Sequence, residues 1–190
     1  QTIGVDKHAA EYGLSDFWAL PRGVTDGFCD NLINEYSKKE TPKEEPVIGN
    51  GSVDLNIRNT QRVILPQDAG IGASLTAFGL NTNHHIWKYD ITHSNQTEFL
   101  IYEPDGKYET HVDTFHKHCD ETRKLTVLAF LNDDFEGGRF YIQNANERMY
   151  PPQKKGTILT FPSYMPHGVE PVTKGVRYSV VTWMVGPYFK

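Results

Sequence analysis

Three residues in the C-terminal half have the types and spacing of a metal site. His111 and Asp113 are separated by one residue, and residues i and i+2 of a β-strand point to the same face. Two histidines and one carboxylate on one face of an ion form the facial triad of non-haem Fe(II) oxygenases. His167, which precedes another β-rich run, supplies the second histidine. We therefore predict His111, Asp113 and His167 as catalytic iron ligands.

An arginine lies at the start of the following β-rich run. Arg177 is placed to form a bidentate clamp for a carboxylate, and Ser179 shares its strand face. These features suit 2-oxoglutarate as cosubstrate. Its 1-carboxylate and 2-keto oxygens would occupy two iron positions, and its 5-carboxylate would pair with Arg177 and Ser179. One iron position would remain for O2.

The elements that must position these residues follow from the hydrophobic pattern. Residues 24–39 and 71–80 have helical periodicity, with Thr25 or Asp26 as the cap of the first helix. Residues 53–57 alternate as a short extended stretch, and residues 84–85 are expected to end the second helix. Short runs rich in β-branched and aromatic residues follow, separated by turn residues, at 86–91, 98–102, 125–131, 139–142, 157–161 and 178–185.

The order of these elements predicts an α+β, mainly β fold. We expect a jelly-roll core with N-terminal helices packed on one outer face. The 190 residues suit one domain, 1–190, with a helical N-terminal part, 1–84, and a β core from about 85 to 190.

Bulk properties narrow the function classes. The net charge of -5 disfavours non-specific nucleic-acid binding, and no apolar run is long enough for a membrane span. Two cysteines and the absence of a secretion-signal pattern near the N-terminus favour a reducing, cytoplasmic compartment.

Two longer segments resemble a known family. Residues 123–138 (RKLTVLAFLNDDFEGG) and 155–183 (KGTILTFPSYMPHGVEPVTKGVRYSVVTW) are similar to the prolyl 4-hydroxylase superfamily of Fe(II)/2-oxoglutarate-dependent oxygenases. The bacterial and phage PKHD-type hydroxylases are the nearest branch we can name. The similarity is clear from about residue 99 to 187 and faint before it.

The resemblance implies a double-stranded β-helix, Fe(II), 2-oxoglutarate and O2, with ascorbate as a reductant. It assigns Tyr102 to the 2-oxoglutarate pocket and Tyr108 to the surroundings of substrate and iron. Phe130 stands where hypoxia-sensing relatives have a tyrosine, so Thr126, Ser179 or Tyr102 must complete the 5-carboxylate pocket. We add Arg58 and Arg62 as candidate lid residues lining the substrate pocket. In the family, His116, His118 and Cys119 fall in a surface loop, where we expect no ligand role.

The leading hypothesis is a dioxygenase that hydroxylates a peptidyl residue, with proline in a protein or peptide as the expected target, while 2-oxoglutarate is converted to succinate and CO2. One alternative is the same chemistry on a free amino acid or another small molecule. The other is a non-catalytic metal- or ligand-binding jelly roll. We expect no nucleic-acid or membrane partner, and a bacterial or phage-infected cytoplasm. The sequence leaves the oligomeric state open.

Overall fold

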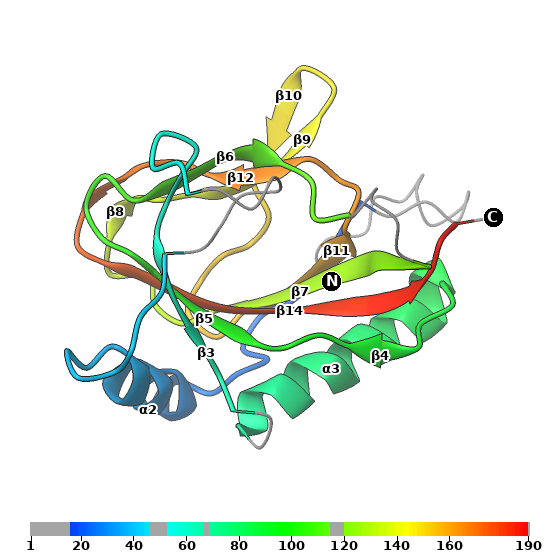
Figure 1. The fold of residues 1–190 in the computed structure, drawn as a ribbon, viewed down its shortest axis with the longest axis horizontal. Coiled ribbons are helices and arrows are strands. Elements are labelled where there is room, and N and C mark those ends of the chain that lie inside the picture. Colours follow the sequence, from blue (N-terminus) through cyan, green and yellow to red (C-terminus); the bar gives the residue numbers. More distant parts are fainter. Residues whose placement is uncertain (1–15, 46–52, 67–68, 115–119, 190) are drawn as a thin grey trace.

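The chain folds into two facing antiparallel β-sheets with helices on one side (Figure 1). The computed structural model describes residues 16–45, 53–66, 69–114 and 120–189. The larger sheet has the strand order β1-β11-β7-β14-β5-β3, with β4 also paired to β14, and the smaller has the order β10-β9-β12-β6-β2. A short ladder joins β13 to β8.

The strands are β1 (Trp18–Leu20), β2 (Arg58–Asn59), β3 (Gln61–Ile64), β4 (His93–Ser94), β5 (Glu98–Tyr102), β6 (Lys107–His111), β7 (Glu121–Phe130), β8 (Glu136–Gly137), β9 (Phe140–Asn144), β10 (Glu147–Met149), β11 (Ile158–Pro162), β12 (His167–Val169), β13 (Val172–Lys174) and β14 (Arg177–Pro187). The helices are α2 (Asp26–Tyr36) and α3 (Gly70–Thr82), which continues into the π-helical segment η1 (Asn83–Trp87).

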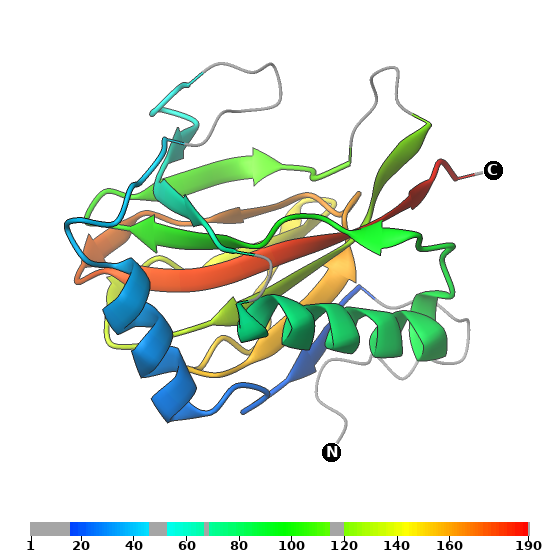
Figure 2. The same cartoon turned by 60° about the horizontal axis from the view of Figure 1, so that its bottom comes forward.

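Two apolar clusters stabilise this arrangement. The first lies between the larger sheet and the helices and includes Ile71, Leu75, Val127 and Met184. Figure 2 shows α2 and α3 on the same face of this sheet. The second cluster fills the space between the sheets and includes Trp183. Strand alternation therefore sends one set of side chains toward the helices and the other into the interior. The α+β, mainly β double-stranded β-helix with helices on one outer face is confirmed.

The first predicted helix is confirmed in type and cap. The Thr25 side chain accepts a hydrogen bond from the Phe28 backbone N–H, as an N-cap residue does. The helix ends at Tyr36, earlier than expected. The division at residue 84 needs correction, because the N-terminal part also supplies β1, β2 and β3. β1 and β3 pair with β11 and β5 and extend the larger sheet at both ends.

Two predicted extended segments are wrong. Residues 55–57 form a turn, because the Asp54 carboxylate accepts a hydrogen bond from the Asn56 N–H at 3.0 Å and its carbonyl accepts one from Arg58 N–H at 2.8 Å. Residues 86–91 form no strand, and the first two of them belong to η1. The Asn83 side chain donates to the Tyr89 carbonyl and accepts from the Tyr89 N–H, both at 2.9 Å, which holds the chain as it leaves the helix.

Candidate metal and cosubstrate site

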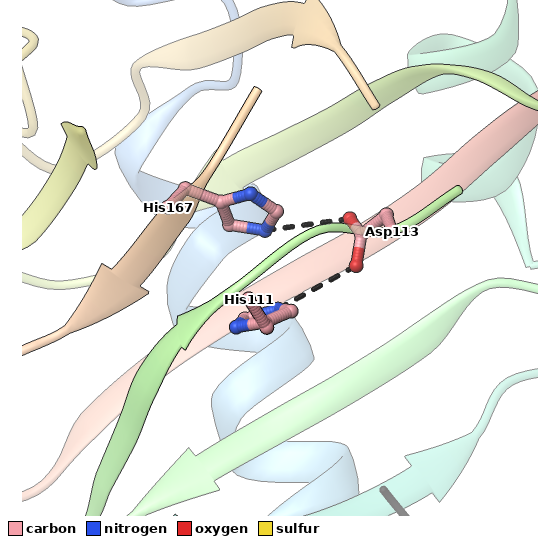
Figure 3. Close-up of side chains that lie close together, drawn as sticks. All are labelled: His111, Asp113 and His167. Carbon is pink, nitrogen blue, oxygen red and sulfur yellow. Dashed lines mark ion pairs between the residues drawn. The ribbon is translucent and has the colours of Figure 1, made fainter. Parts of the chain in front are cut away.

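The three predicted iron ligands converge at neighbouring strands of the smaller sheet (Figure 3). His111 ends β6 and lies directly opposite His167, the first residue of β12. Asp113 follows β6, and its backbone N–H donates to the Ser163 carbonyl at 2.9 Å. His111 Nε2 lies 3.5 Å from Asp113 Oδ1, and His167 Nε2 lies 3.4 Å from Oδ2. One atom of each residue lies within 4.8 Å of the others, a spacing that can hold one ion.

Both imidazole rings are oriented by backbone carbonyls. His111 Nδ1 lies 2.8 Å from the Glu109 carbonyl, and His167 Nδ1 lies 2.9 Å from the Met165 carbonyl. A carbonyl only accepts, so each Nδ1 carries the proton and each Nε2 presents its lone pair, as a metal ligand requires. Burial, followed by the nearby charge of His167, lowers the pKa of His111. The neutral, ligating form of the His111 ring is therefore favoured.

The Asp113 carboxylate is nearly buried and held by two donors. Thr126 Oγ1 donates to Oδ2 at 2.8 Å, and Trp183 Nε1 donates to the same oxygen at 2.9 Å. The other oxygen, Oδ1, remains for an ion. Burial would raise the pKa of this carboxyl, but without an ion the protonated forms of His167 and His111 outweigh that effect through charge and hydrogen bonds and hold the pKa well below its usual range. Asp113 is thus an anion at neutral pH.

A buried arginine lies on the same face of β14 as Trp183. Arg177 is 2% exposed, and Ser179 Oγ accepts a hydrogen bond from its Nη1 at 3.1 Å. Its guanidinium lies 4.9 Å from the centre of the Tyr102 ring and 5.6 Å from that of Phe130. Within the described part of the chain it forms no ion pair, and its buried Nε lacks a hydrogen-bond acceptor. Burial lowers the pKa of Arg177.

This environment is incomplete without an anion. A buried charge normally pairs with an opposite charge, because removal from water is costly. Among the described residues, Arg177 has only a hydroxyl and two aromatic rings around its guanidinium, so a carboxylate ligand would supply the missing partner. Ser179 and Tyr102 therefore lie where the sequence analysis expected them, beside Arg177. Their contact with 2-oxoglutarate stays a prediction.

Thr126 has a different place from the one expected. We predicted it as a possible contact of the 5-carboxylate, but its hydroxyl is bonded to Asp113 and to Ser163 Oγ, the latter at 2.9 Å. The register explains this position, because Thr126 pairs with Trp183, six residues along β14 from Arg177. Thr126 therefore lies beside the candidate metal ligand Asp113 and not beside Arg177.

The two predicted lid arginines also differ from expectation. Arg62 Nη1 pairs with the buried Glu98 carboxylate at 2.8 Å, and Nη2 pairs with Glu44 at 3.1 Å. These ion pairs give Arg62 a structural role at the sheet edge. Arg58 lies over the Tyr108 ring, 4.5 Å from its centre, and Tyr108 stacks on His111. His116, His118 and Cys119 lie outside the described residues.

Two residues beside the candidate metal ligands, Trp183 and Ser163, were not predicted from the sequence. Trp183 was expected only as a core residue, and its 5% exposure agrees, but its indole N–H also holds Asp113. Strand alternation could have found it, because Trp183 lies six residues after Arg177 and so shares its face. Ser163 had no such signal, because it lies in the turn before His167.

Comparison with known proteins agrees with this geometry. Residues 97–185 match the model of the 2OG-Fe(II) oxygenase superfamily. A PKHD-type hydroxylase of Synechococcus sp. (strain JA-2-3B'a(2-13)) is 30% identical over 88 residues, covering 44% of this chain and 39% of that protein. One from Synechococcus sp. (strain CC9311) is 32% identical over 105 residues, covering 54% and 48%. The chain thus spans less than half the length of these curated relatives.

Solved structures show the same fold. A Pseudomonas putida prolyl-4-hydroxylase has a TM-score of 0.72 at 20% identity, covering 89% of this chain and 92% of that one. A Trichoplax adhaerens prolyl hydroxylase, in complex with a hypoxia inducible factor peptide fragment, has a TM-score of 0.75 at 18% identity, covering 93% and 86%. The chain therefore resembles the 2OG-Fe(II) oxygenases of the prolyl 4-hydroxylase and PKHD type, in sequence over residues 97–185 and in its fold.

Proposed function

We propose that the protein is an Fe(II)- and 2-oxoglutarate-dependent dioxygenase that hydroxylates a peptidyl residue, with proline as the target. The single observation that carries the cosubstrate is the buried guanidinium of Arg177, which has no carboxylate partner within the described residues and an orphaned Nε. The His111, Asp113 and His167 donor set fits Fe(II), which accepts imidazole and carboxylate ligands and leaves positions open in this arrangement.

The chain's own residues would bind and orient the iron and the cosubstrate, and they would exclude water from the site. His111, Asp113 and His167 would hold Fe(II) through two Nε2 atoms and Oδ1, while Thr126 and Trp183 keep Oδ2 occupied. Arg177 would hold the 5-carboxylate, with Ser179 fixing the guanidinium. When bound, iron and 2-oxoglutarate would supply O2 activation: O2 is the oxidant, and 2-oxoglutarate, as it becomes succinate and CO2, gives two of the four electrons that O2 takes, while the substrate C–H bond gives the other two. The apolar cluster between the sheets limits water near the reacting groups.

The substrate class rests on the type of relatives that the chain resembles. The two relatives described above are PKHD-type hydroxylases, and the Trichoplax adhaerens structure holds a peptide fragment. We extend that class, a proline in a protein or peptide, to this chain. No helix among the described residues is long and apolar enough to cross a membrane. The free, buried thiol of Cys29 supports our further proposal of a reducing, cytoplasmic compartment.

Mass spectrometry and succinate assays test this proposal together. The protein is incubated with Fe(II), 2-oxoglutarate, ascorbate and air, with a panel of proline-containing peptides, matched alanine peptides and free proline. We expect one oxygen to be added to a proline peptide, with one succinate per hydroxylation, and neither product with His167→Ala. Hydroxylation of free proline but of no peptide would contradict a peptide substrate and support the small-molecule alternative. Absence of succinate under every condition would contradict the enzyme proposal.

A further inference from the structure

Three side chains form a continuous stack that ends on an iron-ligand candidate. The Tyr108 and His111 rings lie 3.5 Å apart between centres, with an angle of 16° between their planes. The Arg58 guanidinium lies 4.5 Å from the centre of the Tyr108 ring. One face of Tyr108 is covered by His111, so the guanidinium lies over the other face. The stack therefore runs Arg58, Tyr108, His111.

Backbone pairing builds this stack. β2 places Arg58 directly opposite Tyr108 on β6. Tyr108 and His111 are three residues apart and would lie on opposite faces of a regular strand. The pairing of β12 with β6 is irregular here, since His167 lies opposite His111 and Val169 opposite Tyr108. Between these two pairs β12 advances by two residues and β6 by three. The extra residue forms a bulge in β6, which turns both rings to the same face.

The stack leaves the His111 ring a single orientation. Its Nδ1 is held by the Glu109 carbonyl at 2.8 Å, and Tyr108 fixes the ring plane, so Nε2 points toward Asp113. A metal-bound imidazole is poor in electrons, and the face of a tyrosine ring is negative, so the stack also favours the ligated form of His111. Burial raises the pKa of Tyr108 to about 12, and the phenol stays neutral.

Arg58 has no competing partner within the described residues. It forms no ion pair there, and its buried Nε has no hydrogen-bond acceptor. Its contact with the Tyr108 ring is a cation–π interaction, which gains strength as water is excluded. The neighbouring Arg62, by contrast, is held by two carboxylates and touches neither ring in the stack.

We propose that Arg58 and Tyr108 are positioning residues, which fix the orientation of His111 and strengthen it as a metal ligand. This inference rests on the proposed function, because it assumes that His111 binds the metal. It replaces the lid role that the sequence suggested for Arg58. The stacked ring carries the effect, so the phenol hydroxyl of Tyr108 is not required for it.

Cobalt titration tests the proposal without a substrate. Co(II) alone is added to the anaerobic protein, and its visible absorption gives both the dissociation constant and the ligand geometry. Tyr108→Leu removes the ring and should weaken Co(II) binding about 10- to 100-fold and alter the spectrum, as loss of ligand support does. Tyr108→Phe keeps the ring and should restore both the affinity and the spectrum. Arg58→Met should fall between Tyr108→Leu and the unchanged protein.

Arg62→Met is the matched control, because it removes an arginine from β3, the next strand along the chain but part of the other sheet, without touching the stack. We expect it to bind Co(II) like the unchanged protein, even if its melting temperature falls. Circular dichroism of the metal-free variants checks that each is folded. An unchanged Co(II) spectrum and affinity in folded Tyr108→Leu and Arg58→Met overturns the inference alone. Failure of the unchanged protein to bind Co(II) overturns the proposed metal site as well.

Discussion

The hydroxyl of Thr126 allows a test of how the protein orients Asp113, the carboxylate among the three candidate metal ligands. Thr126→Val keeps the side-chain shape but removes the donor that bonds Asp113 Oδ2 at 2.8 Å. Trp183 then remains as the second donor to the same oxygen, at 2.9 Å. With one donor lost, the carboxylate can rotate away from the orientation that presents Oδ1 to the ion.

The expected magnitude follows from this single interaction. A hydrogen bond to a charged group contributes about 1.5–3 kcal/mol, and about 1.4 kcal/mol corresponds to a tenfold change in an equilibrium constant. We therefore expect metal affinity to fall about 10- to 100-fold, the range typical for loss of an outer-sphere partner. Isothermal titration of the anaerobic protein with Fe(II) measures this change. Thr126→Ser retains the hydroxyl and should restore the affinity.

A second threonine provides the control. Thr160 lies on the neighbouring strand β11 and is fully buried, but its hydroxyl has no hydrogen-bond partner within the described residues. Thr160→Val therefore loses no such bond and should leave Fe(II) affinity unchanged, with stability equal or higher. Equal Fe(II) affinity in Thr126→Val and the unchanged protein would refute the reasoning. An equal loss in both valine variants would refute it too.

Three further predictions follow from other parts of the site and fold. Arg177→Met should weaken 2-oxoglutarate binding about 30- to 4000-fold, the range for removing one partner of a buried charge pair, with Fe(II) affinity nearly unchanged; titration of each ligand measures both. The pKa of His111 is lowered in the folded protein, so the unfolded chain binds the extra proton first, and metal-free stability should fall as pH drops below about 6.5. Urea unfolding at several pH values should show a smaller fall for His111→Asn. Gly137→Ala should lower the melting temperature, because φ there is +71° and the new Cβ would clash with the Pro171 carbonyl.

The sequence predicted the fold where each signal was local and strong. The cap at Thr25, the helical spacing of Ile71 and Leu75, and every predicted β-rich run except 86–91 match elements of the structure, because local propensity and burial agree there. The segment after residue 83 failed for a physical reason. Its apolar residues suit a strand, but the Lys88 N–H donates to the Asn83 carbonyl and closes a π-helical turn, and the Asn83 side chain holds Tyr89 where the chain leaves it.

The site was predictable to the extent that spacing defines it. His111, Asp113 and His167 carry a recognisable pattern, and the structure brings them together. Which residue supports which ligand depends on strand register. Thr126 could be placed beside Asp113 rather than Arg177 only once its pairing with Trp183 was known. The stack on His111 depends on an irregularity in β6 that leaves no mark in composition or periodicity.

The most direct test of the central claim is the visible charge-transfer band of the anaerobic complex with Fe(II) and 2-oxoglutarate. We predict this band in the unchanged protein, because three protein ligands would leave iron positions open for the cosubstrate and Arg177 would hold its far carboxylate. His167→Ala should abolish the band while the protein remains folded. A folded, iron-loaded protein without the band, or a band that persists in His167→Ala, would contradict the account.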